Sequence, residues 1–421
     1  MKRKGDKRMQ IGHARICLTP TEPFYLIGYR SKNRYEASTG VHDDIYANAL
    51  LCNDGEKMLF LFSADVLEFE EDMAEDVKTM LQSRFGIERD MVLLCATHNH
   101  SSIVSYHKSW YTGKYDAAYA AWFQEAICDC FQECLNNQQE ASAKIGSQVI
   151  LGYYGNRNHP GVPADNEVIV VKFYDQNGIP FAGFVNWAVH STLISAENTQ
   201  LTSELAGNVS IRLHDAFGFY PAMIVGAAGD CSNRHERQGN DFKELQRVSS
   251  ALASIIQEIS MQQSITMDKL YCQTLFHTIH HDMAFVHEEV KLELEKLAQQ
   301  KKQVNDAQIP HIEQRMEELA KKLDAHEFHL DAKGSVISLG ELQLFVFPGE
   351  LGSAFGKQLK QECETNAIIC GYTNGYYEYF MPRAEYGTSF ETIASPIPAG
   401  EAEKMMLKYI QASKLLTAEK I

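Results

Sequence analysis

The chain has 421 residues, with 39 Lys and Arg residues against 55 Asp and Glu residues, which gives a formal net charge of −16. This excess of negative charge argues against a protein that binds the phosphate backbone of nucleic acids. With 45% hydrophobic and 22% charged residues, the composition is that of an ordinary soluble globular protein and excludes the disordered, collagen-like and coiled-coil classes.

The N-terminal residues are basic, but no apolar run of the length that a secretory signal needs follows them. The longest apolar stretches, such as residues 58–62 and 91–96, are far shorter than the roughly 20 residues that cross a bilayer. We therefore expect no export signal, no transmembrane segment and a cytoplasmic location. The 10 cysteines fit that location, because they lie in the apolar contexts typical of buried, reduced thiols.

Short apolar runs alternate with helical patterns along most of the chain, which is typical of a layered α/β fold. The predicted strands cover residues 58–64, 91–96, 168–173, 182–188, 222–226 and 342–347. Most of them are followed by a residue that can take part in chemistry, and ligands in open α/β sheets gather beyond strand ends. These residues are Asp65, His98, His190, Asp230 and Glu350.

Residues 283–326 form a charged segment whose apolar positions step by threes and fours, with a break at residues 305–310. This pattern predicts an antiparallel helical hairpin inserted between strands. Packing is the expected role of its apolar stripe, since such a stripe usually buries itself. The alternative roles of the hairpin are a lid and a contact between copies of the chain in a homo-oligomer.

Three apolar runs are each followed by side chains of the types that can bind a metal or a substrate. Residues 93–102 read LLCATHNHSS, and in a strand the imidazoles of His98 and His100 would point to one face. A second run ends at His190, and a third leads into a small-residue turn that carries Asp230 and Ser232. The alternative interpretation of each motif is a set of buried, hydrogen-bonded polar residues.

Taken in order, these segments resemble the neutral ceramidases and the wider group of proteins that share their amidase domain. The resemblance covers nearly the whole chain, from residue 11 to residue 401. The segments that carry it are CLTP at 17–20, GY at 28–29, GVHDDIYANA at 40–49, THNHSSI at 97–103, NRNH at 156–159, GDCSN at 229–233 and PGE at 348–350.

The resemblance implies an α/β fold, a layered mixed-sheet amidase domain of the neutral-ceramidase type with the helical hairpin at 283–326 inserted in it. Residues 1–421 would form a single catalytic domain, without the C-terminal β-sandwich domain that long ceramidases carry. One catalytic Zn²⁺ is also implied, held by two imidazoles, a carboxylate and a phenol. These ligands map to His98, His190, Glu350 and Tyr379.

Four further residues receive roles from the same resemblance. Ser232 is similar to the catalytic serine of the family, and His100 becomes an acid–base group able to titrate near neutral pH. Arg157 resembles a substrate-contacting arginine, and Asp230 is expected to orient a neighbouring group. Whether Ser232 attacks the amide directly stays open, and attack by zinc-activated water is the alternative that we favour.

These implications predict a zinc-dependent hydrolase of a linear N-acyl amide, with a small or lipid-like substrate such as those of sphingolipid metabolism. The chain departs from the family pattern at Ser102, Ile103, Asn233 and Phe390. Phe390 replaces a tyrosine whose hydroxyl could stabilise an oxyanion. The candidates to replace that hydroxyl are Tyr376, Tyr377 and Tyr386.

Two other functions stay open from the sequence. One is a zinc hydrolase that acts on esters, lactones or acylated sugars. The other is a non-catalytic binding protein that keeps the fold and docks a partner on its helical hairpin, because a fold does not guarantee a function.

Overall fold

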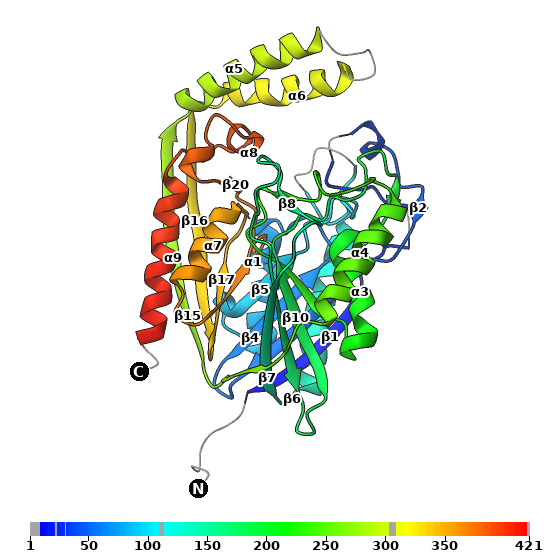
Figure 1. Ribbon diagram of the computed structural model, residues 1–421, viewed down its shortest axis with the longest axis vertical. Coiled ribbons are helices and arrows are strands. Elements are labelled where there is room, and N and C mark those ends of the chain that lie inside the picture. Colours follow the sequence, from blue (N-terminus) through cyan, green and yellow to red (C-terminus); the bar gives the residue numbers. More distant parts are fainter. Residues whose placement is uncertain (1–8, 22, 30, 109–112, 303–308, 419–421) are drawn as a thin grey trace.

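The structure is a computed structural model that describes residues 9–21, 23–29, 31–108, 113–302 and 309–418. Figure 1 shows central sheets flanked by helices, and one pair of helices that lies apart from the sheets at one end of the molecule. This arrangement confirms the predicted mixed α/β class.

The first sheet contains five strands, β1 (Gln10–Cys17), β3 (Tyr46–Asn53), β4 (Met58–Ala64), β5 (Val92–Ala96) and β6 (Gln139–Glu140). Their order is β5-β4-β3-β1-β6, in which β4 and β5 are parallel and the other pairs antiparallel. Helix α2 (Ala117–Asn137) packs on β1 and β3, and α1 (Glu71–Phe85) packs on α2. Cys128, Cys130 and Cys134 are buried on α2, as predicted for core cysteines.

Gly12 in β1 lies directly against the backbone of α2. A Cβ atom at this position would lie 1.9 Å from the carbonyl oxygen of Cys134, a backbone atom that cannot move aside cheaply. We expect Gly12→Ala to lower the free energy of unfolding by about 2 kcal/mol or more through overpacking, measured by urea denaturation. Gly239→Ala is the control, because its nearest contact is a side-chain carbon at 3.6 Å. Equal stability of the two variants would contradict this account of the packing.

The second sheet contains β7 (Ser142–Val149), β9 (Glu167–Tyr174), β10 (Pro180–Trp187), β12 (Ala222–Val225) and β14 (Gln263–Ile265). Its order is β12-β10-β9-β7-β14, with β10 and β12 parallel and the other pairs antiparallel. Helix α3 (Glu204–Phe217) packs on β12 and against α4 (Phe242–Gln257). One hydrophobic cluster contains buried residues of both sheets, including Phe62 in β4 and Val185 in β10.

The third sheet has the order β15-β16-β17-β19, formed by β15 (Leu270–Asp282), β16 (Glu327–Leu339), β17 (Leu342–Val346) and β19 (Asn366–Cys370). β15 and β16 form a long antiparallel ladder, whereas β17 and β19 are parallel. Helix α9 (Glu401–Ala418) packs on β15 and β16, and α7 (Ser353–Glu362) packs on β19 and α9. A second hydrophobic cluster, which includes Phe347 and Tyr409, lies here.

Helices α5 (Ala284–Lys301) and α6 (Ile309–Lys321) lie in the part of the chain where the hairpin is predicted. They extend from the end of the β15–β16 ladder, as Figure 1 shows. Val290 and Leu319 belong to a small hydrophobic cluster that also includes Ile393 of α8 (Phe390–Ala394). Residues 303–308 lie outside the described residues, and the hairpin's role as a lid or oligomer contact stays a prediction.

Each of the six predicted strands corresponds to an observed strand with ends within two residues: β4, β5, β9, β10, β12 and β17. A small parallel pair, β2 (Gly40–Val41) and β11 (Gln200–Leu201), lies outside the three main sheets. In the described residues, every helix is too short or too polar to span a bilayer.

Candidate active site and metal centre

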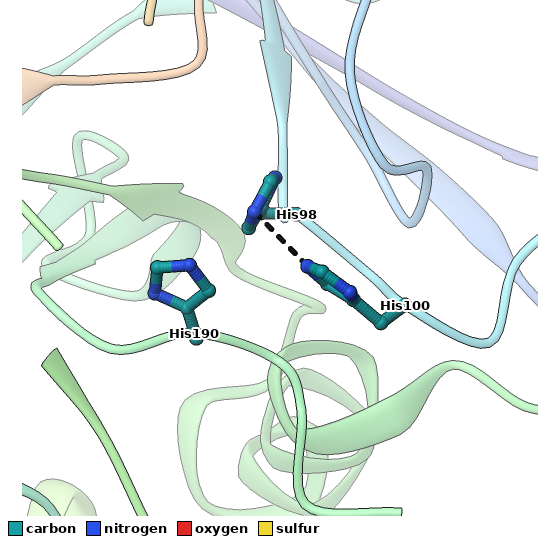
Figure 2. Close-up of side chains that lie close together, drawn as sticks. All are labelled: His98, His100 and His190. Atoms are coloured by element: carbon teal, nitrogen blue, oxygen red, sulfur yellow. Dashed lines mark hydrogen bonds between the residues drawn. The ribbon is translucent and has the colours of Figure 1, made fainter. Parts of the chain in front are cut away.

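Three histidines meet just beyond the ends of strands from the first two sheets. His98 and His100 follow β5, and His190 follows β10. Their ring nitrogens lie within 4.8 Å of one another, so the group could hold a metal ion, and Figure 2 shows the three rings converging. His98 and His190 are almost completely buried, with 2% and 1% of their surfaces exposed.

The backbone brings His98 and His100 together by a route that differs from the predicted one. β5 ends at Ala96, and His98 has a φ of 55°, in the left-handed region. The prediction that strand alternation aims both imidazoles at one face is therefore wrong, because a turn does so and leaves their Nε2 atoms 3.1 Å apart. A non-glycine residue in this region costs about 1–3 kcal/mol, and such residues cluster at functional sites.

Backbone carbonyls fix the orientation of two imidazoles. His98 Nδ1 lies 2.9 Å from the carbonyl oxygen of Leu67, and His190 Nδ1 lies 3.0 Å from that of Cys231. A carbonyl oxygen only accepts, so each Nδ1 carries a proton and each Nε2 is the nitrogen that faces the centre of the group. Burial lowers the pKa of His98 to about 3, which keeps this ring neutral at physiological pH.

Glu350 approaches the imidazoles from a short parallel pair of strands, β18 (Glu350–Leu351) and β20 (Tyr379–Phe380). Its Oε2 lies 3.0 Å from His190 Nε2, and its Oε1 lies 3.6 Å from His98 Nε2. Burial raises the pKa of this carboxyl, but the two imidazoles and the Arg157 guanidinium outweigh burial and lower it. Glu350 is therefore a carboxylate at neutral pH.

Two tyrosines hold Glu350 in place. Tyr372 Oη donates to Glu350 Oε2 at 3.2 Å, and Tyr376 Oη donates to Oε1. From the sequence, Tyr376 is a candidate only to replace a missing hydroxyl. Tyr372 has no predicted role, because its irregular backbone, with a φ of 51°, follows no periodic pattern. The other two candidates bind elsewhere: Tyr377 donates to Glu71, and Tyr386 donates to a backbone carbonyl.

Arg157 lies between the histidine group and Tyr379. Its Nη1 is 3.3 Å from His190 Nε2, and its Nη2 donates to Tyr379 Oη at 3.2 Å. Its Nε donates to Glu391 of α8 at 2.5 Å. Tyr379 therefore lies at the edge of the histidine group and is linked to it by Arg157. The sequence alone predicts no role for Glu391.

Ser232 and Asp230 lie beside the histidine group. β13 (Cys231–Ser232) pairs with β8 (Gly155–Asn156), and Ser232 Oγ accepts a hydrogen bond from the Arg234 amide at 3.2 Å. Within the described part of the chain, Ser232 forms no hydrogen bond with the three histidines. Asp230 accepts hydrogen bonds from Asn156 Nδ2 at 2.8 Å and from the Ser353 amide at 2.7 Å. Asp230 thus ties the loop that carries Arg157 to the start of α7.

Two solved structures superpose on nearly all of this chain. One is neutral ceramidase from Pseudomonas aeruginosa, with a TM-score of 0.76 and 16% sequence identity over 98% of this chain and 75% of that chain. The chain has the neutral ceramidase fold. The other, a ceramidase complexed with C2, has a TM-score of 0.75 and 16% identity over 98% of this chain and 76% of that chain. The sequence matches no protein-family model.

The predicted ceramidase-type fold is thus confirmed, and within it most of the predicted site residues form one network of contacts. That network contains His98, His100, His190, Glu350, Arg157 and Tyr379. Ser232 and Asp230 are neighbours of the network through the backbone of Cys231 and the Arg157 loop. Phe390, which departs from the family pattern, is 47% exposed and meets the Tyr379 ring edge-on.

Proposed function

We propose that the chain is a zinc-dependent hydrolase of a linear N-acyl amide. The observation that carries this proposal is the pair of buried imidazoles, His98 and His190, whose Nδ1 atoms face backbone carbonyls while their Nε2 atoms face the Glu350 carboxylate. Metal-binding histidines are typically held in this way. The likeness to proteins named as ceramidases supports an amide substrate, because that name denotes cleavage of the amide bond of ceramide.

The donor set and its spacing fit zinc. A tetrahedral site with zinc bonds of about 2.0–2.2 Å spaces its ligand atoms by roughly 3.3–3.6 Å. The observed distances between Glu350 oxygens and imidazole Nε2 atoms are 3.0 Å and 3.6 Å. His98, His190 and Glu350 would hold the ion, with Tyr379 as the proposed fourth ligand. A bound zinc ion supplies Lewis-acid chemistry, which polarises an amide carbonyl and activates water.

His100 belongs to the same group of nitrogens, but we assign it acid–base work. Its Nδ1 is buried and has no hydrogen-bond partner in the part of the chain that the structure describes, whereas the Nδ1 atoms of His98 and His190 are each held by a carbonyl. A ring without that second support is poorly fixed as a ligand. Burial, followed by the charges of His98 and His190, lowers the pKa of His100 well below its ordinary value, so the ring is neutral near pH 7 and has one proton that it can give. We therefore propose that His100 delivers the proton to the leaving amine.

The other polar side chains bind and orient the substrate. Arg157, held by Glu391, presents a fixed positive charge beside His190, where it would donate to the substrate carbonyl as negative charge develops there. Asp230 keeps the Arg157 loop in place through its hydrogen bond with Asn156. Ser232 positions the substrate from the neighbouring strand.

Metal content tests this proposal directly. Plasma mass spectrometry is expected to find near-stoichiometric zinc in the purified protein and less than about a tenth of that in His190→Ala, because even groups that only support a ligand change metal affinity 10–100-fold. Chelation should lower the melting temperature, and added zinc should restore it, because binding to the native state alone stabilises that state. His280→Ala is the control, since this histidine is mostly exposed. Failure to bind zinc when it is supplied would overturn the proposed centre.

Matched substrates separate the proposed reaction from its closest alternative. An N-acyl amide and the ester of the same acyl chain would be compared under identical conditions. Hydrolysis of the amide that is lost in His190→Ala is the expected result. Hydrolysis of the ester alone would overturn the proposed amide substrate and favour an ester hydrolase.

A further inference from the structure

Arg34 is a buried guanidinium without an anionic partner. It ends a short helical turn (Lys32–Arg34), and its side chain is completely buried. Its Nη2 donates to the carbonyl oxygen of His100 at 3.2 Å, while its Nε and Nη1 have no hydrogen-bond partner among the described residues. No carboxylate of the described residues forms a salt bridge with it. An unpaired buried charge is costly, so we expect an anion from outside the chain to pair with Arg34.

Two more arginines lie in segments that adjoin the histidine group. Arg234 follows Ser232 by two residues and is exposed, and Arg237 Nη1 lies 3.4 Å from the carbonyl oxygen of Thr192. Neither forms a salt bridge with any carboxylate in the described ranges. We call Arg34, Arg234 and Arg237 the arginine cluster.

Tyr29 lies beside both Arg34 and His100. Its ring lies against that of His100, with ring centroids 5.1 Å apart, and the Arg34 guanidinium carbon lies 5.3 Å from its centroid. Burial, followed by Glu204, raises the pKa of the Tyr29 hydroxyl, and the charges of all three arginines oppose that rise. Arg34 therefore lies next to Tyr29 and His100, while the Arg234 amide contacts Ser232 and the Arg237 side chain contacts the Thr192 carbonyl, two residues after His190.

The charges of Glu197 and Glu391 act on Arg34 and Arg234, but no carboxylate in the described part of the chain forms a salt bridge with the arginine cluster. Glu204 accepts hydrogen bonds from the amides of Ile194 and Leu205, and Glu197 accepts one from Asn33. Glu391 pairs with Arg157. In a chain with a net charge of −16, three arginines near the candidate active site that form no salt bridge within the described residues point to an anion that binds there.

We infer that the amine half of the substrate carries an anionic group, a carboxylate or a phosphate, which the arginine cluster binds. This inference rests on the proposed function and specifies its substrate class. His100, the proposed proton donor to the leaving amine, is the residue whose carbonyl Arg34 contacts, so the amine half lies on the side of the arginine cluster. The planar guanidinium fork matches the oxygens of both anions, and an N-acyl amino acid is the simplest substrate of this kind.

Binding of uncleavable ligands tests this inference without requiring turnover. The zinc-supplied protein would be titrated calorimetrically with N-(octylsulfonyl)glycine and with its uncharged carboxamide, and then with N-(octylsulfonyl)phosphoethanolamine and its uncharged ethanolamine counterpart. We expect an anionic ligand to bind at least about tenfold more tightly than its neutral match, because charge-assisted hydrogen bonds are the strong ones. The pair with the larger difference identifies the anion as a carboxylate or a phosphate.

Variants assign the preference to the arginine cluster. Arg34→Gln and Arg234→Gln should each reduce the preference for the anionic ligand about tenfold while the neutral ligand binds as before. Arg234 is exposed, so its variant is expected to fold even if Arg34→Gln does not. Arg84→Gln, which removes a surface arginine paired with Glu125, is the control and should keep the full preference.

The outcomes separate this inference from the proposed function. Equal binding of the charged and neutral ligands, or a preference that survives in Arg234→Gln and in any folded Arg34→Gln, would overturn the inference. A protein that keeps the anion preference but hydrolyses no N-acyl amide would overturn the hydrolase proposal alone. Faster hydrolysis of neutral amides than of anionic ones would support the hydrolase proposal and would overturn the inference that the arginine cluster binds the substrate.

Discussion

Glu350→Gln is expected to abolish stoichiometric zinc binding and to reduce kcat/KM for amide hydrolysis by more than about a hundredfold, since even residues that only support a metal ligand change affinity or activity 10–100-fold. Glutamine keeps the size of the side chain but removes the negative charge that faces the Nε2 atoms of His98 and His190. It also turns an amide nitrogen toward one of the two tyrosine hydroxyls that Glu350 now accepts from. Zinc analysis and steady-state kinetics on the same preparations measure both effects.

Glu362→Gln is the matched control for this substitution. Glu362 lies on α7 near Glu350 in the sequence, but its side chain is largely exposed and pairs with Lys414. Its variant should bind zinc and turn over substrate like the wild type. Unchanged zinc content and turnover in Glu350→Gln would remove the central claim of the proposed mechanism.

Arg157→Met should destabilise the zinc-free protein by about 3–5 kcal/mol, because removing one partner leaves a buried charge uncompensated. The charge is that of Glu391, which is 1% exposed and would lose its guanidinium partner while keeping the hydrogen bond from Asn158. Urea denaturation of both proteins after chelation measures the difference without a contribution from the metal. A loss below about 1 kcal/mol would show that the pair is not an essential contact.

The stability lost in Arg157→Met should depend on pH in a direction that the pKa of Glu391 determines. Burial raises the pKa of Glu391, but Arg157 leads the opposing contributions and lowers it in the native protein. A carboxyl with a lowered native pKa contributes stability above its ordinary pKa and loses it as the pH falls through the lowered value. Without Arg157, burial raises the native pKa, so stability falls as pH rises. The difference in free energy of unfolding between the wild type and Arg157→Met should therefore increase from about pH 4 to pH 7.

A double variant separates the ion pair from the packing around it. Arg157→Met combined with Glu391→Leu removes both charges and should recover much of the lost stability, because replacing a buried ion pair with apolar groups is often neutral. It should not recover hydrolysis, since the proposed contact with the substrate carbonyl is absent. Recovery of both properties would contradict the role assigned to Arg157.

The parts of the fold that were predicted are those with a strong local signal. β4 reads MLFLFSA and is almost entirely buried, so a continuous apolar run identified it. β1 reads QIGHARIC, and β7 reads SAKIGSQV, in which polar residues and glycine interrupt the apolar positions. Such strands form because the neighbouring strands pair with them, and this long-range pairing leaves no clear local pattern.

The site was predictable in its residues but not in its geometry. The resemblance supplied His98, His190 and Glu350, and the structure brings these three together. The turn at His98 could not be foreseen, because a histidine in the left-handed region follows no simple sequence rule. The partners that hold the site, such as the carbonyl of Leu67 and the carboxylate of Glu391, carry no signal in the sequence since folding alone makes them neighbours.

The candidate metal centre joins the two main hydrophobic clusters. His98 and His190 follow Ala96 and Val189 of the first cluster, whereas Glu350 and Tyr379 precede Leu351 and Phe380 of the second. An ion held by all four residues would couple the two clusters, so that neither could open without releasing it. Zinc-loaded protein should then unfold in a single cooperative step, and its unfolding should be slower than that of the zinc-free protein.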